Sequence, residues 1–201
     1  MHPYLHAQTN PDKAALIMAG SGETVTYRKL DDRSNQGAQL FRAIGLQAGD
    51  GIAFFTENPP RYSELLWAAQ RAGLRFTCLS SKLTVDEVAY ILQDCQAKAF
   101  ITSTALLGIA VPAAAQAGTS NLYVLGESAS GFENFEAARA RYPATPIADQ
   151  TSGSAMLYSS GTTGRPKGVK RAGVVDPDIA APNTLGVLGT MLYGWSSDTV
   201  Y

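Results

Sequence analysis

The sequence predicts an α/β fold, a doubly wound and mainly parallel sheet with helices on both faces. Apolar segments typical of strands alternate with amphipathic helical segments at roughly two dozen residues per unit, a spacing that suits helical crossovers between parallel strands. The run IAFFT at residues 52–56 is apolar enough for a strand buried on both faces. Because the crossovers are right-handed, a helix lies on one face of the sheet when the next strand is added on one side. It lies on the other face when the next strand is added on the opposite side.

The first units follow an N-terminal arm that is expected to be extended. Residues 23–27 read as a short strand, and the next helix, predicted over residues 29–44, can be capped by Thr26 and stopped by Gly45. After the buried strand at residues 52–56, apolar positions at helical spacing predict a helix over residues 61–72, ending at Gly73. Trp67 and Tyr62 lie on or beside its apolar face and are expected in the core.

The later units repeat this order. A strand at residues 75–79 precedes a helix that begins at a capping box, Thr84 with Glu87 three residues later, and reaches Cys95. The remaining predictions are a strand over 98–102, a helix over 106–117 that contains Pro112, a strand over 121–125, a helix over 132–141, a linker over 141–154, a strand over 155–158 and a helix over about 185–193.

Composition excludes several classes of partner. Sixteen Lys and Arg against seventeen Asp and Glu give a net charge of -1, so no general attraction to nucleic acid is expected. No apolar stretch approaches the roughly eighteen residues of a membrane span, and no leader-like segment begins the chain, which predicts a cytoplasmic protein without an integral membrane segment. Cys78 and Cys95 are expected to be buried thiols, and His2 and His6 to be surface residues without a metal or catalytic role.

The segment YSSGTTGRPKG at residues 158–168 stands apart from the rest. Its glycines let backbone N–H groups approach a ligand, and its hydroxyls and Lys167 add donors, a combination that suits a polyphosphate. The segment does not match a Walker loop. Gly168 stands where that loop has Ser or Thr, and Pro166 pushes Arg165 towards an extended conformation where a Walker loop enters a helix.

This segment resembles the phosphate-binding loop of the adenylate-forming superfamily, which includes acyl-CoA synthetases, luciferases and nonribosomal adenylation domains. Residues 26–73 and 83–103 resemble the amino-terminal pattern of the same superfamily in order and spacing. The resemblance implies contacts to the β- and γ-phosphates of ATP from seven residues: Ser159, Ser160, Gly161, Thr162, Thr163, Gly164 and Lys167. Ser159 replaces the more usual threonine and keeps the hydroxyl.

The resemblance implies a two-step reaction. A fatty or other hydrophobic carboxylic acid attacks ATP in the presence of Mg²⁺, and the acyl adenylate then passes to coenzyme A. Two alternatives remain open: an adenylating enzyme that loads a carrier protein, and a nucleotide-binding module without ligase chemistry.

The superfamily's later motifs are missing from these 201 residues, which contain no Glu after Glu136 and no Lys after Lys170. Residues 1–201 are therefore expected to be the N-terminal portion of an AMP-binding domain, without catalytic or metal-ligating residues of their own, and inactive alone. Residues 170–195 depart from the superfamily's pattern and suggest an insertion of the kind found in some fatty-acid CoA ligases.

Overall fold

The centre of the protein is a six-stranded sheet in which every pair of neighbouring strands is parallel. The computed structural model describes residues 2–159, 166–169, 178–180 and 184–196. The strand order is β7-β6-β5-β3-β4-β8, and the strands are β3 (Gly51–Phe55), β4 (Arg75–Leu79), β5 (Ala97–Ser103), β6 (Asn121–Leu125), β7 (Glu133–Asn134) and β8 (Ser154–Ala155). The predicted parallel α/β sheet is confirmed.

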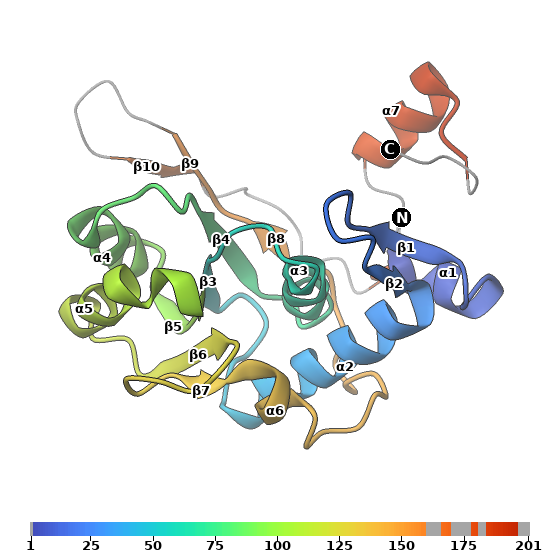
Figure 1. Ribbon diagram of the computed structural model, residues 1–201. Coiled ribbons are helices and arrows are strands. Elements are labelled where there is room, and N and C mark those ends of the chain that lie inside the picture. Colours follow the sequence, from blue (N-terminus) through green and yellow to red (C-terminus); the bar gives the residue numbers. More distant parts are fainter. Residues whose placement is uncertain (1, 160–165, 170–177, 181–183, 197–201) are drawn as a thin grey trace.

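The direction of strand addition reverses twice, first beside β3 and again when the chain returns from β7 to add β8 beside β4. The chain steps outward from β3 to β4 and then returns past β3 to form β5, so right-handed crossovers place the two connecting helices on opposite faces. Helices α2 (Tyr27–Ala43), α3 (Arg61–Arg71) and α6 (Phe135–Arg139) cover one face. Helices α4 (Val85–Asp94) and α5 (Leu107–Ala117), the latter preceded by the short 3-10 helix η1 (Thr104–Leu106), cover the other (Figure 1).

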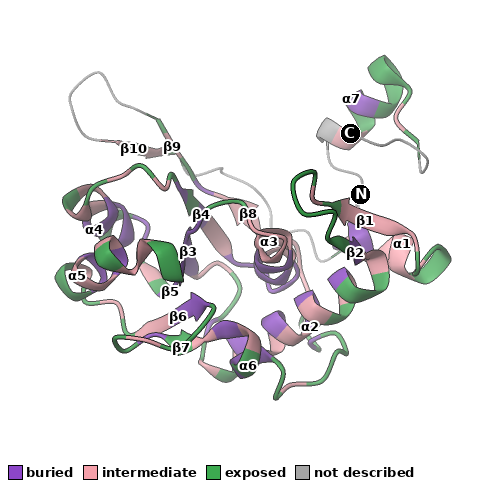
Figure 2. Ribbon diagram, in the orientation of Figure 1, coloured by how far each residue is buried: buried purple, intermediate pink, exposed green. Residues whose placement is uncertain are grey.

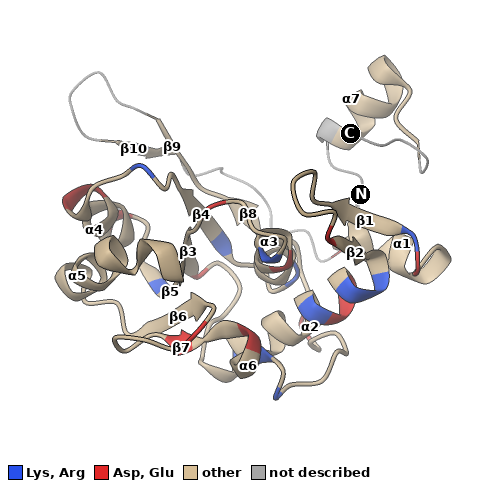
Figure 3. Ribbon diagram, viewed as in Figure 1, with Lys and Arg blue, Asp and Glu red and all other residues tan. Residues whose placement is uncertain are grey.

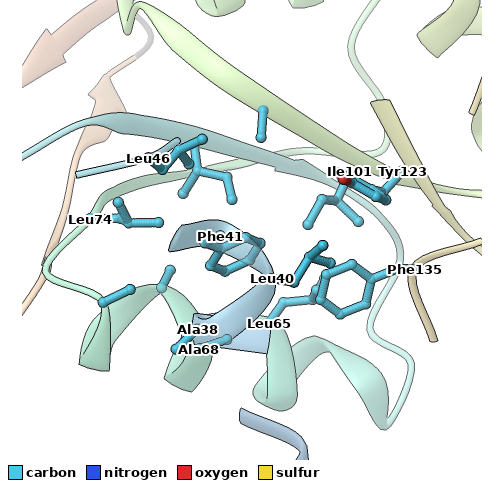
Figure 4. Packing of buried hydrophobic residues seen from close by; sticks show 14 of the residues in the cluster. Ala38, Leu40, Phe41, Leu46, Leu65, Ala68, Leu74, Ile101, Tyr123 and Phe135 are labelled. Atoms are coloured by element: carbon cyan, nitrogen blue, oxygen red, sulfur yellow. The ribbon is translucent and has the colours of Figure 1, made fainter. Parts of the chain in front are cut away.

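Each face of the sheet has its own hydrophobic core. Side chains alternate along β3, so Ile52 and Phe54 join the cluster under α2 and α3, while Ala53 and Phe55 join the cluster under α4 and α5. Figure 2 shows the buried residues gathered on the central strands and on the helix faces that meet them. In the first cluster the rings of Phe41 and Phe135 lie 6.1 Å apart between their centroids (Figure 4). The apolar run at residues 52–56 is thus explained by burial on both faces.

The helix termini follow the predicted capping. Thr26 Oγ1 accepts a hydrogen bond from the Lys29 N–H at 3.3 Å, and Thr84 and Glu87 form a capping box at the start of α4. Helix α5 accommodates Pro112 and ends at Gly118, which adopts a positive φ of 70°. The predicted helix over 132–141 is shorter than expected, because β7 occupies its first residues and only Phe135–Arg139 is helical.

The expectation of an extended N-terminal arm is wrong. Residues Pro3–Thr9 form helix α1, in which Pro3 occupies the first turn, where a missing N–H costs nothing. The predicted strand near residue 25 is β2 (Thr24–Thr26), but it pairs antiparallel with β1 (Ala14–Ile17) in a separate two-stranded sheet. His2 caps α1 and is 3% exposed, so its assignment to the surface is also wrong, while His6 is half-buried.

The two cysteines differ in burial. Cys95, at the end of α4, is buried as predicted. Cys78 is exposed, which corrects the prediction of a second buried thiol. It lies at the carboxyl end of β4, beyond the residues that β8 covers, and there it meets Tyr62 in the first turn of α3. Tyr62 and Trp67 are both only partly buried.

The predicted linker follows the surface of α2. Gln36 Nε2 and Gln39 Nε2 donate to the carbonyls of Tyr142 and Thr145, and Arg42 pairs with Asp149 at 3.0 Å. The linker ends one residue early, since Ser154 already pairs with Arg75 as part of β8. Among the described residues, no helix combines the length and apolarity needed to cross a membrane.

Candidate functional site at the β9–β10 ribbon

The glycine-rich segment is carried by a two-stranded antiparallel ribbon that leaves the main sheet at Met156. The N–H of Met156 donates to the Phe76 carbonyl at 2.9 Å, which extends the pairing of β8 with β4. The chain then forms β9 (Leu157–Ser159), which pairs with β10 (Lys167–Val169) away from the sheet (Figure 1). The strand predicted over 155–158 is therefore divided between two sheets and is not buried along its whole length. Its first half belongs to the sheet, and Leu157 in its second half is 64% exposed.

The ribbon places Ser159 directly opposite Lys167. These residues are register partners, as are Gly168 with Tyr158 and Val169 with Leu157. Partners in an antiparallel pair share one face, with Cβ atoms about 5 Å apart, so the Ser159 hydroxyl and the Lys167 side chain extend from the same side. Both residues are exposed. One hydroxyl and one ammonium group side by side form a donor set that suits an anionic phosphate oxygen.

Two of the seven predicted phosphate ligands, Ser159 and Lys167, lie within the described residues. Ser160, Gly161, Thr162, Thr163 and Gly164 lie outside the described residues, as does Arg165. The ribbon brings the two ends of this segment together, because Ser159 and Lys167 flank it. Lys167 lies in a strand rather than at the start of a helix, in agreement with the exclusion of a Walker loop.

The inner side of the ribbon rests on the end of α4. Tyr158 donates a hydrogen bond from its hydroxyl to Asp94 Oδ2 at 2.5 Å. Burial and this hydrogen bond to Asp94 raise the pKa of the Tyr158 phenol above its ordinary value. A Cβ atom added to Gly168 would lie 2.4 Å from Met156 Cε and 3.0 Å from Asp94 Oδ2, so the ribbon is in close contact with the helix. Sequence reasoning missed Asp94, and the only local signal was the glycine at position 168.

A neighbouring groove of about 310 Å³ does not fit a polyphosphate. It lies between α4 and α5 beside Pro166, and its lining includes the carboxylates of Asp86 and Glu87. Two carboxylates and no cation in this lining would repel an anion. The outer face of the ribbon is therefore a better phosphate surface than this groove.

Other charged side chains gather far from the ribbon. Charges of both signs alternate along α2 and meet those of α3 and α6 (Figure 3). Within the described ranges, no group of three or more His, Cys, Asp or Glu could hold a metal ion.

Comparison of the sequence with known families gives one match that covers most of the chain. Residues 5–172 match the family described as AMP-binding enzyme. The chain is 32% identical over 169 residues to the fatty acid–[acyl-carrier-protein] ligase ScoC of Streptomyces coeruleorubidus, covering 82% of this chain and 31% of the relative. It is also 32% identical over 173 residues to long-chain fatty acid transport protein 1 of Mus musculus, covering 80% and 27%.

A third relative has a different substrate in its name. The crotonobetaine/carnitine–CoA ligase of Citrobacter koseri is 29% identical over 175 residues, covering 81% of this chain and 34% of the relative. The chain thus spans between 27% and 34% of the length of these three curated relatives.

Solved structures share the fold. The anthranilate CoA ligase AuaEII in complex with anthranoyl-AMP has a TM-score of 0.72 at 21% identity, covering 83% of this chain and 32% of that chain. A benzoate CoA ligase from Burkholderia xenovorans LB400 has a TM-score of 0.68 at 24% identity, covering 83% and 32%. At these identities the likeness establishes the architecture, which is that of the sheet and helices described above.

Proposed function

The chain belongs to the AMP-binding enzyme family, and from this premise we propose that it supplies the ATP phosphate-binding loop of an enzyme that activates a carboxylic acid as its acyl adenylate. The observation that carries the proposal is the pairing of Ser159 with Lys167 on the exposed face of the β9–β10 ribbon. It places a hydroxyl and a cation at the two ends of the glycine-rich segment. We propose that Ser160, Gly161, Thr162, Thr163 and Gly164 complete the phosphate contacts.

The chemistry explains why such a loop is needed. A carboxylate oxygen attacks the α-phosphorus of ATP, the bond from that phosphorus to the bridging oxygen of the β-phosphate breaks, and pyrophosphate leaves with the electron pair. Negative charge therefore grows on the β- and γ-phosphates, where donors and the Lys167 ammonium group would stabilise it. The mixed anhydride then reacts with a thiol, which forms the thioester and releases AMP.

The substrate and acceptor are inferred from the relatives. Two of the three named relatives carry fatty acid in their names, which supports a fatty or other hydrophobic acid as the substrate. Coenzyme A is the acceptor that we propose, supported by the CoA ligase among the relatives. The fatty acid–[acyl-carrier-protein] ligase keeps a carrier-protein thiol as the alternative acceptor. A requirement for Mg²⁺, which would neutralise phosphate charge, stays a prediction. A cytoplasmic location also stays a prediction.

Acid-dependent exchange of labelled pyrophosphate into ATP tests the proposal. The complete product of the gene should catalyse exchange with at least one member of a panel of short, long and aromatic carboxylic acids. The 201-residue chain alone is expected to be inactive. ATP binding without exchange for any acid would instead favour the nucleotide-binding module.

Substitution of Lys167 connects this activity to the ribbon. Lys167→Ala should slow exchange roughly a hundredfold, as the loss of one preorganised charge-stabilising group does in other enzymes. Lys29→Ala removes an equally exposed lysine at the start of α2 and serves as the matched control. Equal activity of the two variants would contradict the assignment of Lys167.

A further inference from the structure

We propose that Asp94 and Tyr158 form a positioning pair, which holds the β9–β10 ribbon against α4 and so fixes where Ser159 and Lys167 face the phosphates. This inference rests on the proposed function. It concerns residues that do not touch ATP and act only through the ribbon.

The ribbon needs a support outside the main sheet. β8 pairs with β4 through Ser154 and Ala155 alone, and the Met156 N–H makes the last bond to β4. From Leu157 onwards the ribbon strands pair with each other, and Leu157 and Val169 leave the outer face of the ribbon exposed. A two-stranded ribbon of this kind is marginally stable by itself. Its position must be set by contacts on its inner side.

The inner contacts alternate with the proposed phosphate ligands. Tyr158 is adjacent to Ser159, and Gly168 is adjacent to Lys167, so each inner residue directly precedes or follows an outer one. Successive side chains along a strand point to opposite faces. Fixing Tyr158 on Asp94 therefore fixes the direction in which Ser159 faces, and the close approach of Gly168 does the same for Lys167.

The place of Asp94 in α4 gives an independent argument. Asp94 is the last helical residue of α4, and the last turn of that helix contains no basic residue. A carboxylate at a helix C-terminus meets the negative end of the helix dipole and weakens the helix. Helix stability thus does not explain an aspartate here, whereas the hydrogen bond from Tyr158 does.

The contact at Gly168 shows how little space the ribbon has. A methyl group there would meet Met156 Cε at 2.4 Å, Asp94 Oδ2 at 3.0 Å and Tyr158 Cζ at 3.0 Å. The flexible Met156 side chain can move aside, but Asp94 and Tyr158 would each have to shift by a few tenths of an ångström. Gly168 therefore helps Asp94 and Tyr158 to position the ribbon.

A double-mutant cycle on the complete gene product tests the pair, with the dissociation constant of ATP and the exchange rate as readouts. Tyr158→Phe and Asp94→Ala should each weaken ATP binding roughly tenfold, as expected for one charge-assisted hydrogen bond, with the KM for the acid unchanged. The double variant should be no weaker than either single variant, because both remove the same interaction. Asp94→Asn keeps an acceptor oxygen and should largely restore ATP binding.

Two further variants help to distinguish a loss of ribbon positioning from a loss of folding. Gly168→Ala keeps the hydroxyl and the carboxylate but crowds both Asp94 and Tyr158 at 3.0 Å, so it should weaken ATP binding by shifting the pair. Tyr142→Phe removes a hydroxyl from a tyrosine packed on the opposite face of the sheet and should leave ATP binding unchanged. The free energy of unfolding of each variant is measured in urea alongside.

The outcomes separate this inference from the proposed function. If the wild-type protein binds ATP and exchanges pyrophosphate while Tyr158→Phe and Asp94→Ala bind ATP as it does, the positioning pair is wrong and the proposed function stands. Additive losses in the double variant, or lower unfolding stability with unchanged ATP affinity, would also overturn the pair. A wild-type protein that does not bind ATP overturns both.

Discussion

The imidazole of His2 packs edge-on against the indole of Trp67, with ring centroids 4.7 Å apart. This contact joins the cap of α1 to the middle of α3. The Nδ1 atom of His2 accepts from the Tyr4 N–H at 3.2 Å, and its buried Nε2 has no hydrogen-bond partner among the described residues. Burial and then the charge of Arg71 lower the pKa of His2 from 6.5 to about 3. The ring is therefore neutral in the folded protein at physiological pH.

A loss of stability on acidification follows from this burial. The unfolded chain binds a proton at His2 below pH 6.5 and the folded chain does not until about pH 3, so the free energy of unfolding should fall as the pH is lowered between these values. The slope is about 1.4 kcal/mol per pH unit, or roughly 2 kcal/mol at pH 5. Urea unfolding of the wild type and of His2→Gln at pH 7 and pH 5 measures the difference. Identical pH dependence in both proteins would contradict a buried neutral histidine.

A second prediction concerns Glu64, which is buried between three helices. It accepts hydrogen bonds from Arg33 of α2 at 2.7 Å and from Arg139 of α6 at 2.9 Å. Glu64→Ala would leave these guanidinium groups without their carboxylate, and the free energy of unfolding should fall by about 3–5 kcal/mol. Glu133→Ala, which breaks an exposed pair with Arg141, should cost less than about 1 kcal/mol. Similar losses in the two variants would show that Glu64 is not an essential partner of the cluster.

A third prediction concerns the glycine that leads into β8. A Cβ atom on Gly153 would lie 2.5 Å from the Leu74 carbonyl oxygen and 2.9 Å from that of Ala69. These are backbone atoms that cannot rotate away, so Gly153→Ala should destabilise the protein by about 1–3 kcal/mol. At Gly108 of α5 a Cβ atom would meet nothing within 4 Å, and Gly108→Ala should be neutral or stabilise by up to about 1 kcal/mol. Thermal unfolding measures the stability of both variants. A Gly153→Ala variant as stable as the wild type would contradict the close approach of Gly153 to the Leu74 and Ala69 carbonyls.

Sequence reasoning succeeded where local patterns determine the structure. The strands β3 to β6 coincide with apolar runs, and α4 begins at the capping box formed by Thr84 and Glu87. It failed where tertiary contacts decide. The N-terminal arm was expected to be extended but forms α1, and the burial of His2 depends on α3, which lies far along the chain.

The candidate site shows the same limit. The loop residues could be predicted because their composition is specialised, but the division of residues 155–158 between two sheets could not, since the apolar run continues through Met156. Asp94 and Tyr158 lie far apart in sequence, and neither residue type signals a contact with the other. A pairing of this kind becomes visible only when the sheet has placed α4 beside the ribbon.

The pairing of β8 with β4 also bears on how the protein folds. Arg75 and Ser154 are nearly eighty residues apart along the chain, whereas β3 meets β4 and β5 over much shorter loops. Closing a longer loop costs more conformational entropy, and contacts of this separation slow folding. We therefore expect the sheet to form from β3 outwards and β8 to be added late. During synthesis the segment that enters the phosphate loop would then become ordered only after the strands that receive it have formed.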